Sequence, residues 1–555
     1  MIETKDAGEP VGPPGAAQHW CGPEVRAASS ADAITELGGL PLSAAIHARE
    51  VSCREVMAAY LDRIARLNPR VNAIVNQAPA ETLLVQADAC DAELARGASR
   101  GWLHGMPQAI KDVAAARGFP TTMGCTLLAD AVAREDGVVV RRMKGAGCIV
   151  VGKTNVSEFG LGSHTFNSLF GATRNAWDPA VSAGGSSGGA AVALALHLLP
   201  VAHGSDFMGS LRNPAAWNNV FGLRPSWGRV PNVGADECWV SQLGTEGPMA
   251  RSVADLAALL ATQAGADPSV PLALADDITP LLELIARPAA AWATGAAPTL
   301  VTSSPGHAPE AGSPAQPGPP LPPGGERLLR WRELKGLRIA WLGDMGGHLA
   351  TEEGIVASCE SALRRFEAAG AAVEPVAPGF NLDSVWQAWL VWRVLISARV
   401  GPLLALPGAR AAIKPEAQWE HDQAQGLSFA EFMRASERRS AWYQHLLGLF
   451  ERFDVLALPA TQVWPFPVGD RWPRAIAGRT MDTYHRWMEV TIYATLAGLP
   501  AISVPAAFHA NGRWPAGLQL IGRPRDDAGL LAIAAGYETS ISELLARRPA
   551  EPAAP

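Results

Sequence analysis

Gly184-Gly185-Ser186-Ser187-Gly188-Gly189 is a loop of glycines and serines, and an alanine-rich apolar run joins it to a second such loop, Gly204-Ser205-Asp206-Phe207-Met208-Gly209-Ser210-Leu211-Arg212. Glycine lets a backbone approach a reacting atom closely. Successive peptide N–H groups in such turns form pockets for negative charge. Acyl-transfer enzymes place a nucleophilic serine beside an oxyanion hole of this kind. The two loops together therefore predict a hydrolytic site.

A lysine upstream is expected to join this site. Lys111 follows the apolar stretch Gly105-Met106-Pro107-Gln108-Ala109-Ile110, and only six of the 46 basic residues are lysine. A free lysine has a pKa of about 10.4, so at neutral pH it is a cation and cannot accept a proton. Burial disfavours the charged amine and brings its pKa toward neutrality. A buried Lys111 would therefore be able to act as a general base.

The composition is that of a globular protein. The 555 residues are 48% hydrophobic and 18% charged, which suffices for a large buried core. The formal net charge of −7 argues against a nucleic-acid partner, because no basic field would attract the phosphates. The seven cysteines are scattered and form no CxxC pair, which argues against a disulfide framework or a structural zinc site. We expect neither a metal nor a cofactor.

The sequence shows no sign of export or of a membrane span. Its first residues, Met1-Ile2-Glu3-Thr4-Lys5-Asp6, lack the basic-then-apolar layout of a signal peptide. No apolar run reaches the roughly 18 residues that a membrane span needs. We therefore expect a soluble cytoplasmic protein with no membrane partner.

Composition also suggests where the folded part begins and ends. Residues 1–30 are rich in Gly, Pro and Ala and are expected to form a flexible tail. A Pro/Gly/Ala-rich segment at about 286–326 cannot bury a core and is interpreted as an exposed insertion. Strand and helix patterns continue on both sides of it, so we expect one domain over residues 31–540. Residues 541–555 are expected to be a loose C-terminal tail.

Strand and helix patterns follow one another along this domain. A capping box at Ser52-Cys53-Arg54-Glu55 predicts a helix that ends at Asn68-Pro69. Further helices are expected at about 80–96 and 352–369 and through much of 380–452, and strands at 137–140, 148–152, 337–342, 454–458 and 501–504. Helices between such buried strands are typical of an α/β fold with a mostly buried sheet.

Taken alone, the first loop admits another interpretation. Gly184-Gly185-Ser186-Ser187-Gly188 also fits G-x-S-x-G, the nucleophile elbow of α/β-hydrolases. Ser186 would then be the nucleophile of an esterase, with a histidine such as His509 as its base. The loop is not a nucleotide-binding P-loop, because no lysine follows at the required spacing.

The order of the three pieces is more specific than any one of them. Lys111, then Gly-Gly-Ser186-Ser187-Gly-Gly, then Gly-Ser-Asp-x-x-Gly-Ser210-x-Arg resembles the amidase signature family. Supporting matches stand at 118–124, 152–155, 222–226 and 496–505. The resemblance covers roughly residues 31–540, with 286–326 as an interruption. It implies an α/β/α sandwich around a large central mixed β-sheet.

The resemblance also implies a Ser–Ser–Lys triad. Ser210 would be the nucleophile, and Ser186, which the family places on a cis peptide bond, would bridge Ser210 to Lys111. The family positions of the oxyanion-hole donors are the backbone N–H groups of Phe207, Met208, Gly209 and Ser210. Its positions for supporting residues are Ser187, Asp206 and Arg212.

Candidates for substrate contact are less specific. Phe207 and Met208 replace a threonine and a glycine of the commoner family sequence, and their bulk is expected to reshape the pocket. Trp386, Trp389 and Trp392 share one helical face. Such a stripe is more often core than a binding wall, but Trp386 and Trp389 are retained as candidates for an aromatic wall. Met123 and Gly124, from one of the supporting matches, are further candidates.

The sequence therefore predicts an amidase that hydrolyses the C–N bond of a small-molecule amide, with aryl amides and carbamates as candidate substrates. The alternative is the glutaminase-type A subunit of a tRNA-dependent amidotransferase, which resembles the same family and works with a partner. A homodimer is left open by the sequence.

Overall fold

The computed structural model describes residues 30–232, 237–276, 278, 281 and 334–550. The insertion expected at about 286–326 and nearly all of the expected N-terminal tail lie outside these residues. Over the part of the chain that is described, no helix is both long enough and apolar enough to cross a membrane.

The large sheet contains eight strands, which are β4 (Val201–Asp206), β5 (Phe221–Arg224), β6 (Thr245–Ala250), β7 (Arg338–Trp341), β8 (Ala372–Pro375), β9 (Val455–Pro459), β12 (Ala501–Phe508) and β13 (Pro515–Ile521). They pair in the order β4-β6-β5-β12-β13-β9-β7-β8. Neighbours from β4 to β9 are antiparallel, whereas β9, β7 and β8 run parallel. The sheet is therefore mixed, as predicted.

A smaller sheet contains β1 (Ile74–Val75), β2 (Pro107–Lys111) and β3 (Ile149–Thr154) in the order β1-β3-β2. Side chains attach it to the edge strand β4, because Gln108 Nε2 donates to the Val201 carbonyl and the Lys111 N–H donates to His203 Nδ1. The end of β2 consequently lies beside the end of β4. A separate two-stranded hairpin joins β10 (Ala475–Ile476) to β11 (Arg479–Thr480).

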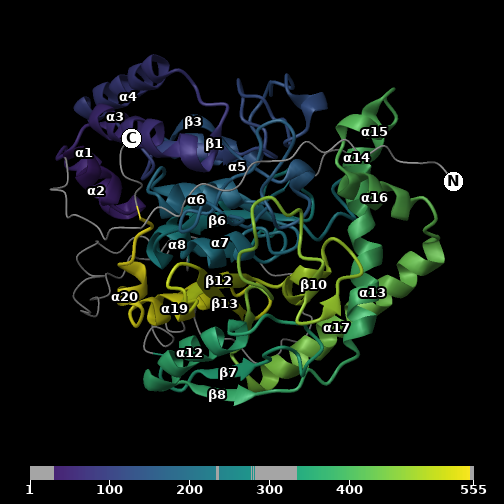
Figure 1. The fold of residues 1–555 in the computed structure, drawn as a ribbon. Coiled ribbons are helices and arrows are strands. Elements are labelled where there is room, and N and C mark those ends of the chain that lie inside the picture. Colours follow the sequence, from purple (N-terminus) through teal and green to yellow (C-terminus); the bar gives the residue numbers. More distant parts are fainter. Residues whose placement is uncertain (1–29, 233–236, 277, 279–280, 282–333, 551–555) are drawn as a thin grey trace, which may run out of the picture.

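Helices cover both faces of the large sheet (Figure 1). On one face, Arg212 donates to the side chain of Gln519 in β13. Leu518 and Leu520, which flank Gln519, point to the opposite face and pack there in the main core. The fold is an α/β/α sandwich, which confirms the predicted class. Its helices are α1 (Ser30–Glu36), α2 (Gly39–His47), α3 (Cys53–Val71), α4 (Ala80–Ala95), α5 (Val138–Gly145), α6 (Gly188–Ala195), α7 (Arg212–Asn218), α8 (Val253–Gln263), α12 (Ile355–Ala368), α19 (Asp527–Glu538) and α20 (Ser542–Leu545).

A helical region lies beside the sheet, on the right in Figure 1. It contains α13 (Leu382–Trp392), α14 (Ser397–Leu404), α15 (Ala409–Ala412), α16 (Pro415–Ala424), α17 (Phe429–Arg452) and α18 (Ile492–Ala497). Short 3₁₀ helices are η1 (Thr126–Leu128), η2 (Glu158–Gly160), η3 (Arg393–Ile396) and η4 (Arg486–Thr491). The stripe Trp386, Trp389 and Trp392 is buried in the second core cluster, where α13 packs against α17.

Three local features differ from the sequence expectation. Residues 138–140 begin helix α5 instead of a strand, because the valines there pack as one buried helical turn. Helix α3 has the predicted capping box but runs past Pro69 to Val71, where Asn72 in the left-handed conformation ends it. Residues beyond 540 include the helix α20, and the carbonyl of Leu544 accepts a hydrogen bond from Asn219. The packed part of the chain therefore extends beyond residue 540.

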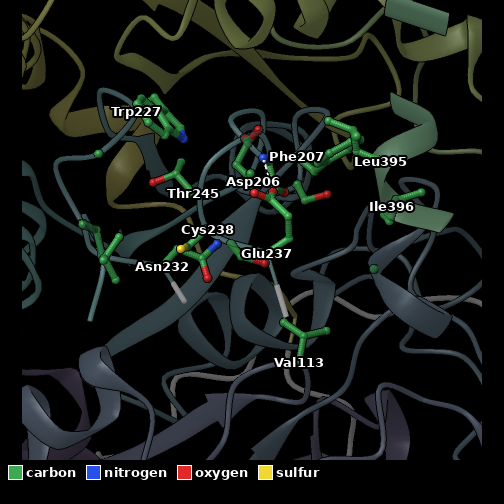
Figure 2. A pocket seen from close by; sticks show the side chains of 18 of the residues that line it. Val113, Asp206, Phe207, Trp227, Asn232, Glu237, Cys238, Thr245, Leu395 and Ile396 are labelled. Atoms are coloured by element: carbon green, nitrogen blue, oxygen red, sulfur yellow. Dashed lines mark hydrogen bonds between the residues drawn. The ribbon is translucent and has the colours of Figure 1, made fainter. Parts of the chain in front are cut away.

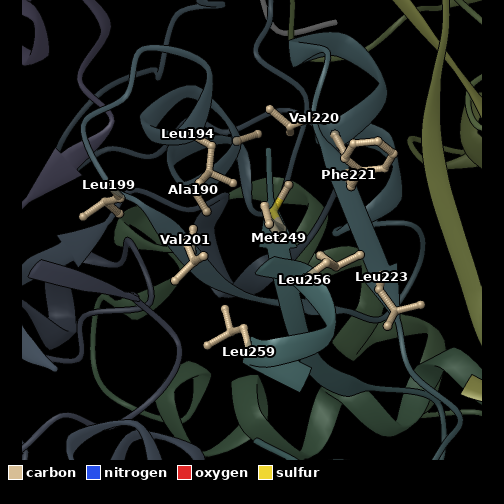
Figure 3. Close-up of a cluster of buried hydrophobic side chains, with 14 of the residues drawn as sticks. Ala190, Leu194, Leu199, Val201, Val220, Phe221, Leu223, Met249, Leu256 and Leu259 are labelled. Atoms are coloured by element: carbon tan, nitrogen blue, oxygen red, sulfur yellow. The ribbon is translucent and has the colours of Figure 1, made fainter. Parts of the chain in front are cut away.

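The main core lies directly behind the two serine loops. Helices α6 and α8 pack Ala190, Leu194 and Leu256 around Val201 and Met249 of the sheet (Figure 3). Helix α6, which follows the first loop, also lies against backbone: a Cβ at Gly189 would stand 2.6 Å from the Ala73 carbonyl oxygen and 2.6 Å from the Asn155 nitrogen. Only glycine allows this approach without a shift.

We expect Gly189→Ala to destabilise the protein by about 1–3 kcal/mol, as over-packing of a core does. Gly145→Ala is the matched control, because a Cβ there has no neighbour within 4 Å and alanine favours a helix. Urea unfolding of both variants measures the difference. Equal stability of the two variants would contradict the close approach of α6.

Candidate active site

Three hydroxyl groups, from the first serine loop and from strand β4, surround one lysine. Lys111 ends β2, and its side chain is fully buried. Its Nζ lies 2.8 Å from Ser186 Oγ, 2.8 Å from Ser187 Oγ and 2.9 Å from Ser205 Oγ. Nζ also lies 3.1 Å from the Ser205 carbonyl oxygen. The structure thus brings Lys111 and the first serine loop together as the sequence predicts.

The first loop is fixed in an unusual conformation. The Gly185–Ser186 peptide bond is cis, as the family resemblance implies. Ser187 Oγ lies 3.2 Å from the Ser205 carbonyl, to which it donates, and the Ser187 N–H donates to the Ser210 carbonyl over 3.2 Å. The two serine loops are therefore hydrogen-bonded directly to each other.

Burial sets the protonation of Lys111. It lowers the pKa of the amine to about 7, while the negative charges of Asp206 and Glu246 act in the opposite direction. Glu246 is linked to the lysine through His203, whose Nδ1 accepts the Lys111 N–H at 3.3 Å and whose Nε2 lies 3.2 Å from Glu246 Oε2. Since Nδ1 is an acceptor, Nε2 carries the proton and donates to the carboxylate.

Asp206 anchors the second loop. Its carboxylate is fully buried and accepts hydrogen bonds from the N–H groups of Gly209 and Leu211. Arg212 binds both carboxylate oxygens, at 3.0 and 2.9 Å, and Arg224 lies 3.3 Å from one of them. Burial alone would raise the pKa of Asp206, but the two guanidinium groups outweigh it and hold the pKa well below its usual range.

One predicted oxyanion donor needs correction. The N–H of Gly209 donates to Asp206 Oδ1 at 2.9 Å, because the aspartate gathers the N–H groups of this turn. It is therefore occupied, and Phe207, Met208 and Ser210 remain as candidate donors. Gly209 has φ +80°, and a Cβ there would stand 2.5 Å from Thr491 Cγ2.

Ser186 and Ser210 line the same pocket. Phe207 lies beside Leu395 and Ile396 on one side of it, and Trp227 lies on the other (Figure 2). The other lining residues are Val113, Phe159, Gly160, Ser205, Asp206, Gly228, Val230, Asn232, Glu237, Cys238, Ser241, Gly244, Thr245, Val270 and Leu272. The lining is thus mixed, with apolar side chains such as Phe207, Trp227 and Leu395 beside polar ones.

The predicted substrate contacts do not form this wall. The pocket lining includes neither Met123 and Gly124 nor the two tryptophans Trp386 and Trp389. Trp389 lies behind the wall, with its ring 5.5 Å from that of Phe207. Met123 likewise supports the wall from behind, since its carbonyl accepts the N–H of Phe159.

Sequence reasoning missed several residues at the site. The sequence assigns Ser205 no role of its own, and His203 and Glu246 stand in strands β4 and β6 without any motif. Much of the pocket wall comes from 227–232 and 237–245, whereas the sequence pointed to Trp386 and Trp389. Only the pairing of β4 with β6 places Glu246 beside Ser205, and sequence periodicity does not reveal that register.

His509 does not accompany Ser186. It lies at the turn between β12 and β13, where its Nδ1 accepts the N–H of Asn511 and its ring contacts Trp464. The partner of Ser186 is Lys111, so the geometry removes the basis for the esterase interpretation.

One group of side chains in the described residues has metal-ligand spacing, namely Cys90, Glu93 and His104. Both ring nitrogens of His104 are already engaged, because Nδ1 accepts the Arg100 N–H and Nε2 contacts the Cys90 carbonyl. Burial also raises the pKa of Cys90, which disfavours the thiolate that metals bind. This cluster is better explained as packing.

Comparison with known proteins agrees with this geometry. A family model described as Amidase matches residues 55–278 and 322–531. The chain belongs to the amidase family. A bacterial aryl acylamidase of the amidase signature enzymes has a similar structure, with a TM-score of 0.78 and 26% identity over 93% of this chain and 99% of the other. The peptide amidase of Stenotrophomonas maltophilia gives a TM-score of 0.69 at 27% identity, over 93% and 98%.

Among curated relatives of this amidase is the A subunit of the glutamyl-tRNA(Gln) amidotransferase from Burkholderia ambifaria. It is 32% identical over 525 residues, which cover 90% of this chain and 96% of the relative. Family membership and the structural neighbours identify the protein as an amidohydrolase acting on C–N bonds.

The position of Glu246 leads to a pH prediction. Its negative charge raises the pKa of Lys111, so Glu246→Gln should lower that pKa. Because the neutral amine is the form that accepts protons, the acid limb of the kcat/KM profile should move to lower pH. Glu360→Gln on the exposed side of α12 is the control and should leave the profile in place. An acid limb that stays fixed in Glu246→Gln would contradict the proposed coupling.

Proposed function

We propose that this amidase hydrolyses small-molecule amides that are apolar next to the scissile bond, aryl amides among them, through an acyl-enzyme on Ser210. The observation that carries the proposal is the fully buried Lys111 in contact with Ser186, which lines one pocket together with Ser210. The expected triad is thus Ser210, Ser186 and Lys111.

The donors and acceptors around Lys111 Nζ indicate which hydroxyl can give its proton to the neutral amine. A neutral amine has two N–H donors and one lone pair. The Ser205 carbonyl can only accept, and Ser187 Oγ, which gives its own proton to that carbonyl, also accepts from the amine. With both N–H groups directed there, the lone pair faces the hydroxyls of Ser186 and Ser205, at 2.8 and 2.9 Å, and we propose that it takes the proton of Ser186.

In the reaction, Lys111 takes the proton of Ser186 while Ser186 takes that of Ser210. Ser210 Oγ then forms a bond to the amide carbon, and the carbonyl oxygen becomes an oxyanion. Backbone N–H groups of Phe207, Met208 and Ser210 are the proposed donors to it. Removing one such donor typically costs about 2.7–4 kcal/mol of transition-state stabilisation.

Collapse of this intermediate breaks the C–N bond. The proton held on Lys111 returns through Ser186 to the departing nitrogen, which leaves as a neutral amine. Water then attacks the acyl-enzyme and gives its proton to the same relay. The products are a carboxylic acid and the free Ser210, so the relay ends in its starting state.

The charges around the pocket favour an uncharged, apolar group next to the scissile bond. Glu237 in the wall accepts the N–H groups of Trp239, Val240 and Ser241, and Asp206 is paired. Among the lining residues that the structure describes, none is Lys, Arg or His. An anion close to the scissile bond would therefore lack a cation, whereas an aryl or alkyl group fits Phe207, Trp227 and Leu395.

The glutaminase-type A subunit is the second candidate, and the relative from Burkholderia ambifaria favours it. Glutamine carries a carboxylate only a few bonds from its amide. The described wall offers that carboxylate no cation, so we rank this function below hydrolysis of an apolar amide.

The proposal is tested by fluorophosphonate labelling followed by intact-mass measurement, together with hydrolysis of acetanilide and of glutamine. We expect one label on the wild type, none on Ser210→Ala, and strongly reduced labelling of Lys111→Ala. Anilide hydrolysis should fall at least about 1000-fold in both variants, as when a residue of a catalytic triad is removed.

Ser186→Ala is the matched comparison, because it removes the bridge but keeps the nucleophile. Labelling that persists in Ser210→Ala and maps to Ser186 would overturn the assignment of the nucleophile. Hydrolysis of glutamine in preference to anilides would favour the amidotransferase function instead.

A further inference from the structure

A second pocket adjoins the catalytic one. Trp227 and Leu272 line both of them. Beyond this shared wall, the second pocket runs between the loop after β5 and helix α17 and is reached by Gln242, Arg439 and Arg525. We call it the outer pocket. A substrate whose amide lies at Ser210 could extend past Trp227 into it.

The chemistry of the outer pocket is opposite to that of the catalytic pocket. Its polar lining consists of two arginines together with serine, glutamine and tyrosine side chains, and none of its described lining residues is Asp or Glu. The catalytic pocket contains Glu237 and Asp206 and no described cation. Negative charge is therefore favoured in the outer pocket and disfavoured next to the serines.

Arg439 is held rigidly in the outer pocket. Its Nε donates to the Leu496 carbonyl at 2.6 Å, and Nη1 lies 3.4 Å from Gln242 Oε1. Its guanidinium carbon lies 4.2 Å from the centre of the Trp392 ring, over which it stacks. These contacts fix the plane of the guanidinium group and leave Nη2 without a hydrogen bond to any described atom.

The charge of Arg439 is not compensated locally. No carboxylate of the described residues forms an ion pair with it, whereas the fully buried Arg212 and Arg393 each have one. Burial lowers its pKa to about 10, so the group is still a cation at neutral pH. A partly buried, pre-oriented arginine without a counter-ion is well suited to bind an anionic ligand.

We propose that the outer pocket binds a carboxylate at the far end of the amide substrate, with Arg439 as the principal contact. The exposed Arg525 adds a second positive charge at the same pocket. This inference rests on the proposed function for the position of the amide. It narrows the substrate class to amides that are apolar at the scissile bond and anionic at a distance from it.

The test compares two anilides of equal length, adipic acid monoanilide and the uncharged hexananilide. The measured quantity is the ratio of their kcat/KM values. A hydrogen bond to a charged group is worth about 1.5–3 kcal/mol, so Arg439→Gln should lower the charged-to-neutral ratio by roughly tenfold or more. Arg439→Lys, which keeps the charge but loses the planar fork, should lower it less.

Arg438→Gln is the matched control, since this neighbouring arginine is exposed and does not line the pocket. It should keep the wild-type ratio, and Arg525→Gln should reduce the ratio moderately. A ratio that is unchanged in Arg439→Gln overturns the proposal. So does an equal loss for both anilides, which would show that Arg439 only packs the wall.

A binding experiment distinguishes failure of the proposed function from failure of the carboxylate site. If the wild type cleaves neither anilide, calorimetry with adipate alone and the Ser210→Ala protein decides on the outer pocket. Binding that weakens about tenfold on the further change Arg439→Gln supports the carboxylate site. Binding that is absent, or equal in both proteins, overturns it.

Discussion

The removal of Lys111 from water is the constraint on which the rest of the site depends. A lysine in solvent holds its proton, and no arrangement of serines around it could then transfer one. The structure buries the amine by attaching the small sheet to the edge of the large one, so that β2 ends against β4. Three hydroxyls replace the lost water. These hydroxyls are uncharged, so they form hydrogen bonds with the amine but do not stabilise its positive charge as a carboxylate would. The pKa of the amine therefore stays low.

The second loop is stabilised by charged partners, in contrast to the uncharged hydroxyls around Lys111. Asp206 is ionised in the interior because two arginines and two backbone N–H groups compensate its charge. Arg212 in turn contacts Thr491, Thr495 and Gln519 from the C-terminal part of the chain. The fold therefore holds a lysine with a lowered pKa and a paired carboxylate close together, because the surroundings of the two groups differ.

The sequence predicted the parts of the site that are local. The glycine–serine loops, the lysine and the cis bond lie at positions that short motifs mark, and the α/β class follows from alternating apolar runs. It did not predict the wall at 227–232 and 237–245 or the pair His203–Glu246, because strand register and long-range packing bring these together. The valines at 138–140 were wrongly assigned to a strand because a short apolar run fits either period. The Gly209 N–H was wrongly assigned to the oxyanion hole because the direction of a turn amide depends on the three-dimensional structure of the turn.

The hydrogen bond from the Ser187 N–H to the Ser210 carbonyl has a consequence for how such an enzyme can change. It joins the two reacting loops into one unit, whereas Trp227, Leu395 and Ile396 belong to separate segments of the chain. Substitutions in those segments alter the shape offered to a substrate without moving the serines relative to each other. The substrate selectivity of this fold can consequently change while the reacting groups stay in place. New substrates can be accommodated by substitutions in the pocket lining alone.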